Sequence, residues 1–421
     1  MTSVSDFLLL GDIIRRERGS IRTGPFGTTL KASEYAAVGV PVVSVGEVGY
    51  GTFRVHKETR RVGPEVLKRL PVYRLNVDDI VFARKGAVDR SAVVRDGQDG
   101  WFLGSDGIRV RLGRGSRQVN PIYLGYALHA ADVRRWLLRN ATGTTMATLN
   151  QDLLERVPVW LPERREQDRI ASALDEASDL IDSLERLSAK TRDVKQGMMQ
   201  ELLTGRTRLP GFTEEWGAVR LRDVGSTYGG LVGKDKSDFG SGSGLFVSFT
   251  EVMTGPRLRG SRLERVRVSK GERQNRVERG DIIFNGSSEI PEEVALAAAV
   301  DFDPSGDVFL NSFCFGFRLS DRQRIDPVYL AHYFRSSRGR AAVSVLAQGA
   351  TRYNIAKTKL IELEPELPPI DEQQAVVAVL RDAEAEIEAV ERRLESARAV
   401  KVGMMQELLT GRTRLPVKEE A

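Results

Sequence analysis

The feature that most constrains this chain is a long internal repeat. The stretch KQGMMQELLTGRTRLP, which begins at Lys195, returns almost unchanged from Lys401 as KVGMMQELLTGRTRLP, 206 positions later in a chain of 421 residues. One copy of the repeated unit therefore accounts for about half of the chain. Repeats that stack into solenoids or propellers are usually about 20–50 residues long. The sequence therefore predicts two duplicated domains and not a solenoid.

Each copy ends in a predicted helix of about 40 residues. Apolar residues recur there at alternating steps of four and three, which is the heptad pattern of a coiled-coil seam. Because a helix with one apolar seam needs a partner, we expect the two helices to pair; the alternative is that each lies separately on its own domain. The seam comprises Leu174, Ile181, Leu184, Met198 and Leu202 in the first copy and Leu380, Ile387, Val390, Leu394, Met404 and Leu408 in the second.

The earlier part of each copy is more divergent and predicts mixed α+β structure. Runs rich in β-branched and aromatic residues at 41–45, 79–83 and 107–112 have counterparts at 245–249, 281–284 and 313–319. Asn120-Pro121 and Asp326-Pro327 each combine an N-cap residue with a proline at the first helical position. The predicted division is a first globular domain at 1–160, a long helix with linker at 161–210, a second globular domain at 211–366, a second long helix at 367–416 and a tail at 417–421.

Charge is distributed unevenly along the chain. Residues 1–150 carry a net charge of +9 and residues 211–360 carry +4, whereas 151–210 and 361–421 carry −2 and −6. The globular parts are therefore basic and the helical parts are acidic. This pattern indicates that the globular parts bind a polyanion such as a nucleic acid.

Basic residues near predicted turns are the candidate DNA contacts. For any one of them the alternative is ordinary solvated surface charge, so the prediction depends on the group. Asn285 joins the group because Asn285-Gly286-Ser287-Ser288 stands where the first domain has Ala83-Arg84-Lys85-Gly86. The candidates are Arg22, Lys31, Arg54, Arg60, Arg84, Lys85 and Arg90 in the first domain, and Lys234, Lys236, Arg257, Arg259, Asn285 and Arg352 in the second.

Signatures of catalysis are weak. The chain has one cysteine, Cys314, and three scattered histidines, so we expect no metal site and no catalytic residues. The stretch 229–235 resembles a P-loop but lacks its first glycine and its Ser/Thr. The stretch 239–244 resembles an AdoMet-binding motif but has Ser241 in place of a glycine, and we expect it to be a flexible loop. With neither a signal peptide nor a membrane span in view, we expect a cytoplasmic protein that does not contact a membrane.

The order of these motifs resembles the specificity (S) subunit of type I restriction–modification systems. The matching motifs occur in series over nearly the whole chain: Gly24-Pro25-Phe26-Gly27, Gly39-Val40-Pro41-Val42-Val43, Asp79-Ile80-Val81-Phe82-Ala83-Arg84, Gly104-Ser105-Asp106, Leu161-Pro162 with Glu166-Gln167, and the Glu-Leu-Leu-Thr-Gly helix ends. The resemblance implies two target-recognition domains joined by an antiparallel coiled coil with pseudo-twofold symmetry.

The same resemblance implies function and partners. Each domain would read one half of a bipartite site in double-stranded DNA, and two methyltransferase subunits and the restriction/translocase subunits would join the complex. This chain would bind no cofactor, because AdoMet, ATP and Mg²⁺ would be held by those partners.

Other classes of protein remain open at this point. One is the specificity subunit of a related type II system with a bipartite site, and another is a coiled-coil scaffold without sequence-specific DNA binding. A third is an enzyme with its own methyltransferase or nuclease chemistry, for which no complete motif is visible. The basic character of the globular parts argues against the scaffold.

Overall fold

The computed structural model describes residues 7–113, 118–143, 146–349 and 352–415, which form two compact units. Unit 1 comprises residues 1–185 and 392–421, and unit 2 comprises residues 186–391. The division therefore passes through both long helices. The predicted boundaries at 160, 210 and 366 separate globular parts from helical parts, whereas the two units are separated by their contacts. The division into two units therefore does not test those boundaries, which stay a prediction.

Unit 1 contains two four-stranded sheets. The first is antiparallel, in the order β2-β9-β6-β7, and the second is mixed, in the order β3-β5-β4-β8, with β4 parallel to β8; β1 pairs with β10. The strands are β1 (Phe7–Leu9), β2 (Ser20–Thr23), β3 (Tyr35–Ala36), β4 (Val40–Val43), β5 (Arg61–Val62), β6 (Ile80–Ala83), β7 (Ser91–Val93), β8 (Phe102–Leu103), β9 (Gly107–Arg111) and β10 (Pro158–Trp160). The helices before the first long one are α1 (Leu10–Arg16), α2 (Pro64–Arg69), α3 (Pro121–Ala127), α4 (Ala131–Asn140) and α5 (Gln151–Glu155).

Unit 2 repeats this plan with additional strands. Its sheets have the orders β12-β20-β16-β18-β14 and β15-β13-β19, and β11-β22 and β17-β21 form separate pairs. The strands are β11 (Gly217–Ala218), β12 (Gly225–Gly229), β13 (Phe239–Val247), β14 (Arg257–Leu258), β15 (Glu264–Val266), β16 (Ile282–Asn285), β17 (Ser287–Ser288), β18 (Ala297–Val300), β19 (Val308–Leu310), β20 (Cys314–Leu319), β21 (Tyr353–Asn354) and β22 (Glu366–Leu367). The helices before the second long one are α7 (Leu221–Val224), α8 (Phe249–Thr254), α9 (Pro327–Arg335), α10 (Ser337–Ser344) and α11 (Lys357–Leu360).

The duplication extends into the parts whose sequences diverge. Strands β2-β9-β6-β7 of unit 1 follow the same order as β12-β20-β16-β18 of unit 2. A buried carboxylate precedes the central strand in both, and each receives a two-pronged ion pair from the neighbouring strand: Asp79 from Arg111 at 2.6 Å, and Asp281 from Arg318 at 2.8 and 2.9 Å. A buried charge requires such a partner. The same structural device therefore stabilises both sheets.

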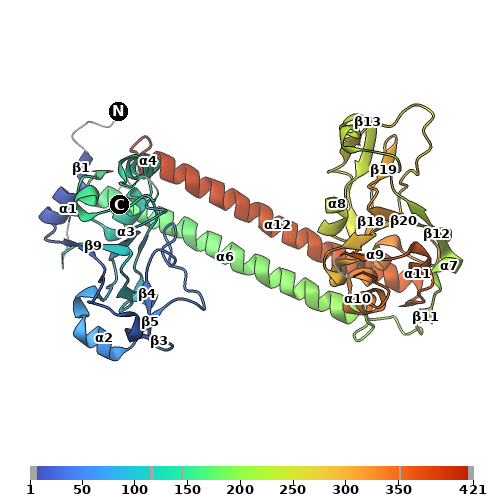
Figure 1. The fold of residues 1–421 in the computed structure, drawn as a ribbon, viewed down its shortest axis with the longest axis horizontal. Coiled ribbons are helices and arrows are strands. Elements are labelled where there is room, and N and C mark those ends of the chain that lie inside the picture. Colours follow the sequence, from blue (N-terminus) through green and yellow to red (C-terminus); the bar gives the residue numbers. More distant parts are fainter. Residues whose placement is uncertain (1–6, 114–117, 144–145, 350–351, 416–421) are drawn as a thin grey trace, which may run out of the picture. The chain divides into compact units, whose positions relative to one another are not determined.

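Two long helices, α6 (Arg164–Leu202) and α12 (Ile370–Leu408), contribute to both units. In unit 1 the start of α6 lies beside the end of α12 (Figure 1). The two share one apolar core, in which Ile170 and Leu174 cluster with Leu408. In unit 2 the end of α6, at Leu202, shares a core with the start of α12, at Leu380. Within each unit the two helices thus run antiparallel. The predicted seam residues are buried or half-buried at every position.

A glutamine near the start of each long helix connects it to the domain before it. The Gln167 side chain accepts a hydrogen bond from the backbone N–H of Asn120 (2.9 Å) and donates to the carbonyl oxygens of Gln118 and Pro162 (3.0 and 2.7 Å). Asn120 also caps α3 by accepting from two backbone N–H groups, which confirms the capping interpretation of Asn120-Pro121. Unit 2 repeats this arrangement with Gln373 and Asp326.

The stretch 239–244, predicted to be a flexible loop, lies within a strand, although its residues 240–243 have no partner in the ladder. These residues form the first part of β13, which pairs with β15. Phe239 and Gly244 both pair with Val266, so the strand contains a bulge, and Gly242 within it has φ +94°. Glycine adopts this conformation without steric cost, which explains how a Gly-Ser repeat can belong to a strand.

Among the described residues, no helix is both long enough and apolar enough to cross a bilayer.

Candidate nucleic-acid interface

Loops gather at one end of the first sheet of unit 1. Thr23 pairs with Ile108 and Ala83 pairs with Gly107, so the loops that follow β2 and β6 and the loop that precedes β9 lie at the same edge. A fourth segment joins them, because the carbonyl oxygen of Ala147 accepts from the N–H of Gly86 (2.8 Å). We call the described residues of these loops, 24–27, 84–86, 104–106 and 146–148, the loop end of unit 1.

The loop end of unit 1 presents an aromatic ring together with cations. The Phe26 side chain is 51% exposed, and the guanidinium carbon of Arg84 lies 4.7 Å from the centre of its ring. Beside it, Lys85 forms an ion pair with Asp106 (3.0 Å). The loop itself requires glycine at position 24, since a Cβ there would lie 1.8 Å from the carbonyl oxygen of Gly104. The backbone therefore holds Phe26 outward, where the ring and the guanidinium group can contact a ligand.

The corresponding end of the first sheet of unit 2, which includes residues 230–233, Gly286, residues 311–313 and Arg352, is the loop end of unit 2. It has a similar backbone plan and different side chains. Residues 230–233 replace 24–27, and Val232, at the position of Phe26, is 72% exposed. Phe313, which is 54% exposed, lies under Arg352 at 5.2 Å. Each loop end thus offers an arginine stacked on an exposed phenylalanine. The pair is Arg84 and Phe26 in unit 1 and Arg352 and Phe313 in unit 2, so different loops supply it in the two copies. Two loop ends with a similar backbone and different side chains can bind different ligands.

The structure brings only part of the predicted set of contacts to the loop ends. Arg84, Lys85 and Arg352 belong to them, and Arg22 lies beside them as an exposed residue of β2. Other candidates lie elsewhere: Lys31, Arg54 and Arg60 are exposed on segments beside the second sheet of unit 1, Arg90 is half-buried just before β7, and Lys236 is exposed in the loop after β12.

Three predicted contacts need correction, because their side chains are largely buried against partners within the fold. Lys234 is only 7% exposed and pairs with Glu272 (2.7 Å). Asn285 is fully buried and donates to the carbonyl oxygen of Glu293 (2.8 Å). Arg257, whose side chain is 16% exposed, forms an ion pair with Glu384 of α12. We therefore assign these three residues to structural roles. Arg259 pairs with Glu388 of α12 but is 43% exposed, and its contact with DNA stays a prediction.

Sequence reasoning missed the exposed apolar tips Phe26, Val232 and Phe313. A signal for two of them was available, since Gly24–Gly27 and Gly230–Gly233 are four-residue segments with glycine at both ends, 206 positions apart. Gly27 and Gly233 have φ values of +57° and +67°, which explains why glycine occurs at that position in both copies.

The groups that could perform catalysis are buried or dispersed. Burial raises the pKa of the Cys314 thiol to about 12, and burial lowers the pKa of His129 and of His332 to about 4. Within the described ranges, no three His, Cys, Asp or Glu side chains gather in a way that could hold a metal ion. The loop ends therefore carry groups suited to binding, and their ionisable groups are mainly cations.

Comparison with known proteins points to one class. No protein-family model matches the chain. Two proteins of Methanocaldococcus jannaschii, the putative type I restriction enzyme MjaX specificity subunit and the type I restriction enzyme MjaVIII specificity subunit, are each 23% identical to it. These matches cover 82% and 75% of this chain and 80% and 76% of the relatives.

A solved structure agrees with these relatives. The S subunit of a type I restriction–modification system from M. genitalium matches with a TM-score of 0.55 and 12% identity over 93% of both chains. The resemblance in the sequence is thus confirmed at the level of sequence relatives and fold. The chain is a homologue of curated type I restriction enzyme specificity subunits and shares the fold of a solved S subunit.

Proposed function

We propose that this chain is the DNA specificity subunit of a type I restriction–modification complex, in which each unit reads one half of a bipartite site. The observation that carries the proposal is the duplicated loop end. Two copies of one sheet each present a tip with an exposed phenylalanine and arginine, and the side chains around the tips differ between the copies. Arginine and lysine contact phosphates and base edges, and apolar side chains contact base edges or open base steps.

The long helices have two roles in this proposal. They set the number of unread base pairs between the half-sites, and they carry the docking surfaces for the partner subunits. We infer two methyltransferase subunits and restriction/translocase subunits as partners, with AdoMet, ATP and Mg²⁺ bound by them. The buried thiol and imidazoles described above support a chain that performs no chemistry itself, so the isolated chain should not turn over AdoMet.

Salt dependence of DNA binding tests the proposal. The complex of this chain with its methyltransferase subunits is titrated with a duplex that carries the methylated site of the source cell. Each phosphate contact contributes roughly 0.9 to the slope of log affinity against log salt. The double variant Arg84→Ala/Lys85→Ala should therefore shallow the slope by up to about 2, and Phe26→Ala should weaken binding without changing the slope.

Arg16→Ala is the matched control. Arg16 ends α1, just before the start of β2, and so lies at the opposite end of the sheet from the loop end. Its slope should equal that of the wild type. If Arg84→Ala/Lys85→Ala binds with unchanged slope and affinity, the loop end of unit 1 does not face DNA. A slope near zero for the wild type would exclude the proposed function altogether.

A further inference from the structure

Each globular domain forms an ion pair with the long helix that follows it in the chain, and the pair occurs at the equivalent position in both copies. In unit 1 Arg95, two residues after β7, forms hydrogen bonds to both carboxylate oxygens of Asp175 on α6 (2.9 and 3.2 Å). In unit 2 Asp301, directly after β18, receives Arg381 of α12 (3.1 and 3.2 Å). A domain–helix ion pair therefore occurs in both copies.

The polarity of this ion pair is reversed between the copies. Asp301 follows Arg95 by 206 positions, and Arg381 follows Asp175 by the same interval. The backbone confirms the correspondence, since the N–H of Val94 and that of Val300 each donate, at 2.8 Å, to the residue that precedes the central strand. The domain thus supplies the cation in unit 1 and the anion in unit 2.

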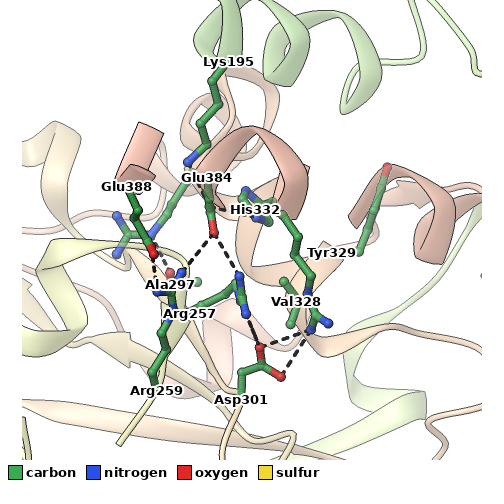
Figure 2. A network of polar contacts seen from close by, with 12 residues as sticks. Lys195, Arg257, Arg259, Ala297, Asp301, Val328, Tyr329, His332, Glu384 and Glu388 are labelled. Atoms are coloured by element: carbon green, nitrogen blue, oxygen red, sulfur yellow. Dashed lines mark hydrogen bonds and ion pairs between the residues drawn. The ribbon is translucent and has the colours of Figure 1, made fainter. Parts of the chain in front are cut away.

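A second helix position also differs in charge between the copies. The side chain of Glu384 on α12 is 11% exposed and receives Lys195 (2.8 Å) and Arg257 (3.1 Å), and Arg257 also pairs with Asp301 (Figure 2). The equivalent residue of α6 is Ser178, whose hydroxyl group bonds instead to the hydroxyl group of Tyr126 (2.9 Å).

At the interval of 206 positions Arg257 falls on Gly51, which has no side chain. A cavity of about 600 Å³ lies between residues 50–53 and α6. The two domain–helix contacts therefore differ in charge and in volume.

Two other parts of the helices are common to both copies and cannot distinguish the domains. The segments from Lys195 and from Lys401, which complete the cores of units 2 and 1, are nearly identical in sequence. The glutamine anchors Gln167 and Gln373 make equivalent hydrogen bonds. We propose that the reversed ion pair and the Ser/Glu difference determine which recognition domain each helix accepts.

Exchange of the domains shows what this assignment means. The second domain on α6 would place Asp301 against Asp175 and would leave Arg257 facing a serine. The first domain on α12 would place Arg95 against Arg381. Like charges at a partly buried contact are destabilising. The transferable module of recognition therefore extends from the domain into the helix, through Ser178 in the first copy and Glu384 in the second.

A two-by-two design in the full chain tests this inference. One chimera carries residues 211–369 in place of residues 5–163, which keeps the repeat register. The chimera and the wild type are each prepared with the native α6 and with α6 carrying Asp175→Arg/Ser178→Glu, which gives four proteins. The readouts are the melting temperature and the rate of trypsin cleavage within the domain that precedes α6. Neither readout involves DNA, so the outcome is independent of the proposed function.

The expected result is an interaction between domain and helix. The recoded helix should raise the melting temperature of the chimera by about 2–6 °C and lower that of the wild type by a similar amount. A change of the same sign in both backgrounds, or in neither, would overturn the proposal.

Point variants provide a second test should the chimera fold poorly. Arg95→Asp and Asp175→Arg should each destabilise unit 1, and the double variant should recover at least half of the summed loss. Additive losses would contradict the inference, because they would show that the two side chains act independently.

Discussion

Replacing Gln373 with alanine should uncouple α12 from the second domain, because this buried side chain makes three hydrogen bonds. It accepts from the N–H of Asp326 (2.9 Å) and donates to the carbonyl oxygens of Arg324 (3.1 Å) and Pro368 (2.8 Å), and it is 1% exposed. A buried neutral hydrogen bond contributes a net of about 0.5–1.5 kcal/mol. Three of them give a loss of roughly 3 kcal/mol in the free energy of unfolding.

The expected signals follow from this magnitude. For a unit the size of residues 186–391, each kcal/mol lowers the melting temperature by about 2–4 °C, so Gln373→Ala should lower it by about 6–12 °C. Hydrogen–deuterium exchange followed by mass spectrometry should show amides of α9 and of the start of α12 exchanging roughly a hundredfold faster. Gln373→Glu should be at least as damaging, because a carboxylate would face two carbonyl oxygens.

The neighbouring residue provides the control. Gln374 is exposed on the same turn of α12, and Gln374→Ala should change the melting temperature by less than about 2 °C. A loss for Gln373→Ala that does not exceed that of Gln374→Ala would refute the argument that this glutamine connects helix and domain.

Two further predictions concern acid stability and spacer length. His332 is fully buried, and burial lowers its pKa to about 4, below the ordinary value of 6.5, so its stabilising contribution is complete above pH 6.5 and is lost as the pH falls towards 4. The melting temperature of the wild type should therefore fall more steeply between pH 6.5 and 4.5 than that of His332→Phe; parallel curves would exclude His332 as the cause. Adding one heptad between Leu174 and Leu202 and one between Leu380 and Leu408 lengthens each helix by ~10 Å, or about three base pairs. Methylation of a library of spacer lengths should then favour a longer spacer with the same half-sites, and retention of the original spacer would show that the helices do not set it.

The sequence alone determined the architecture of this protein because duplication and heptad periodicity are local signals. An interval of 206 residues and a heptad-spaced apolar stripe can be recognised without knowing any contact. The same holds for Asn120 and Asp326, where a capping residue followed by proline marks a helix start through short-range geometry alone. The resemblance to S subunits followed from the order of such local motifs.

The tertiary structure decided which charged residues are available to a ligand. Arg257 and Lys234 look like Arg84 and Lys85 in the sequence, yet the first two are largely buried and have acidic partners that lie 127 and 38 residues away. Pairing of side chains so distant along the chain depends on how strands and helices pack, and net charge carries no information about it. The exposure of Phe26, Val232 and Phe313 has the same origin, because only a folded loop end decides that an apolar side chain faces solvent.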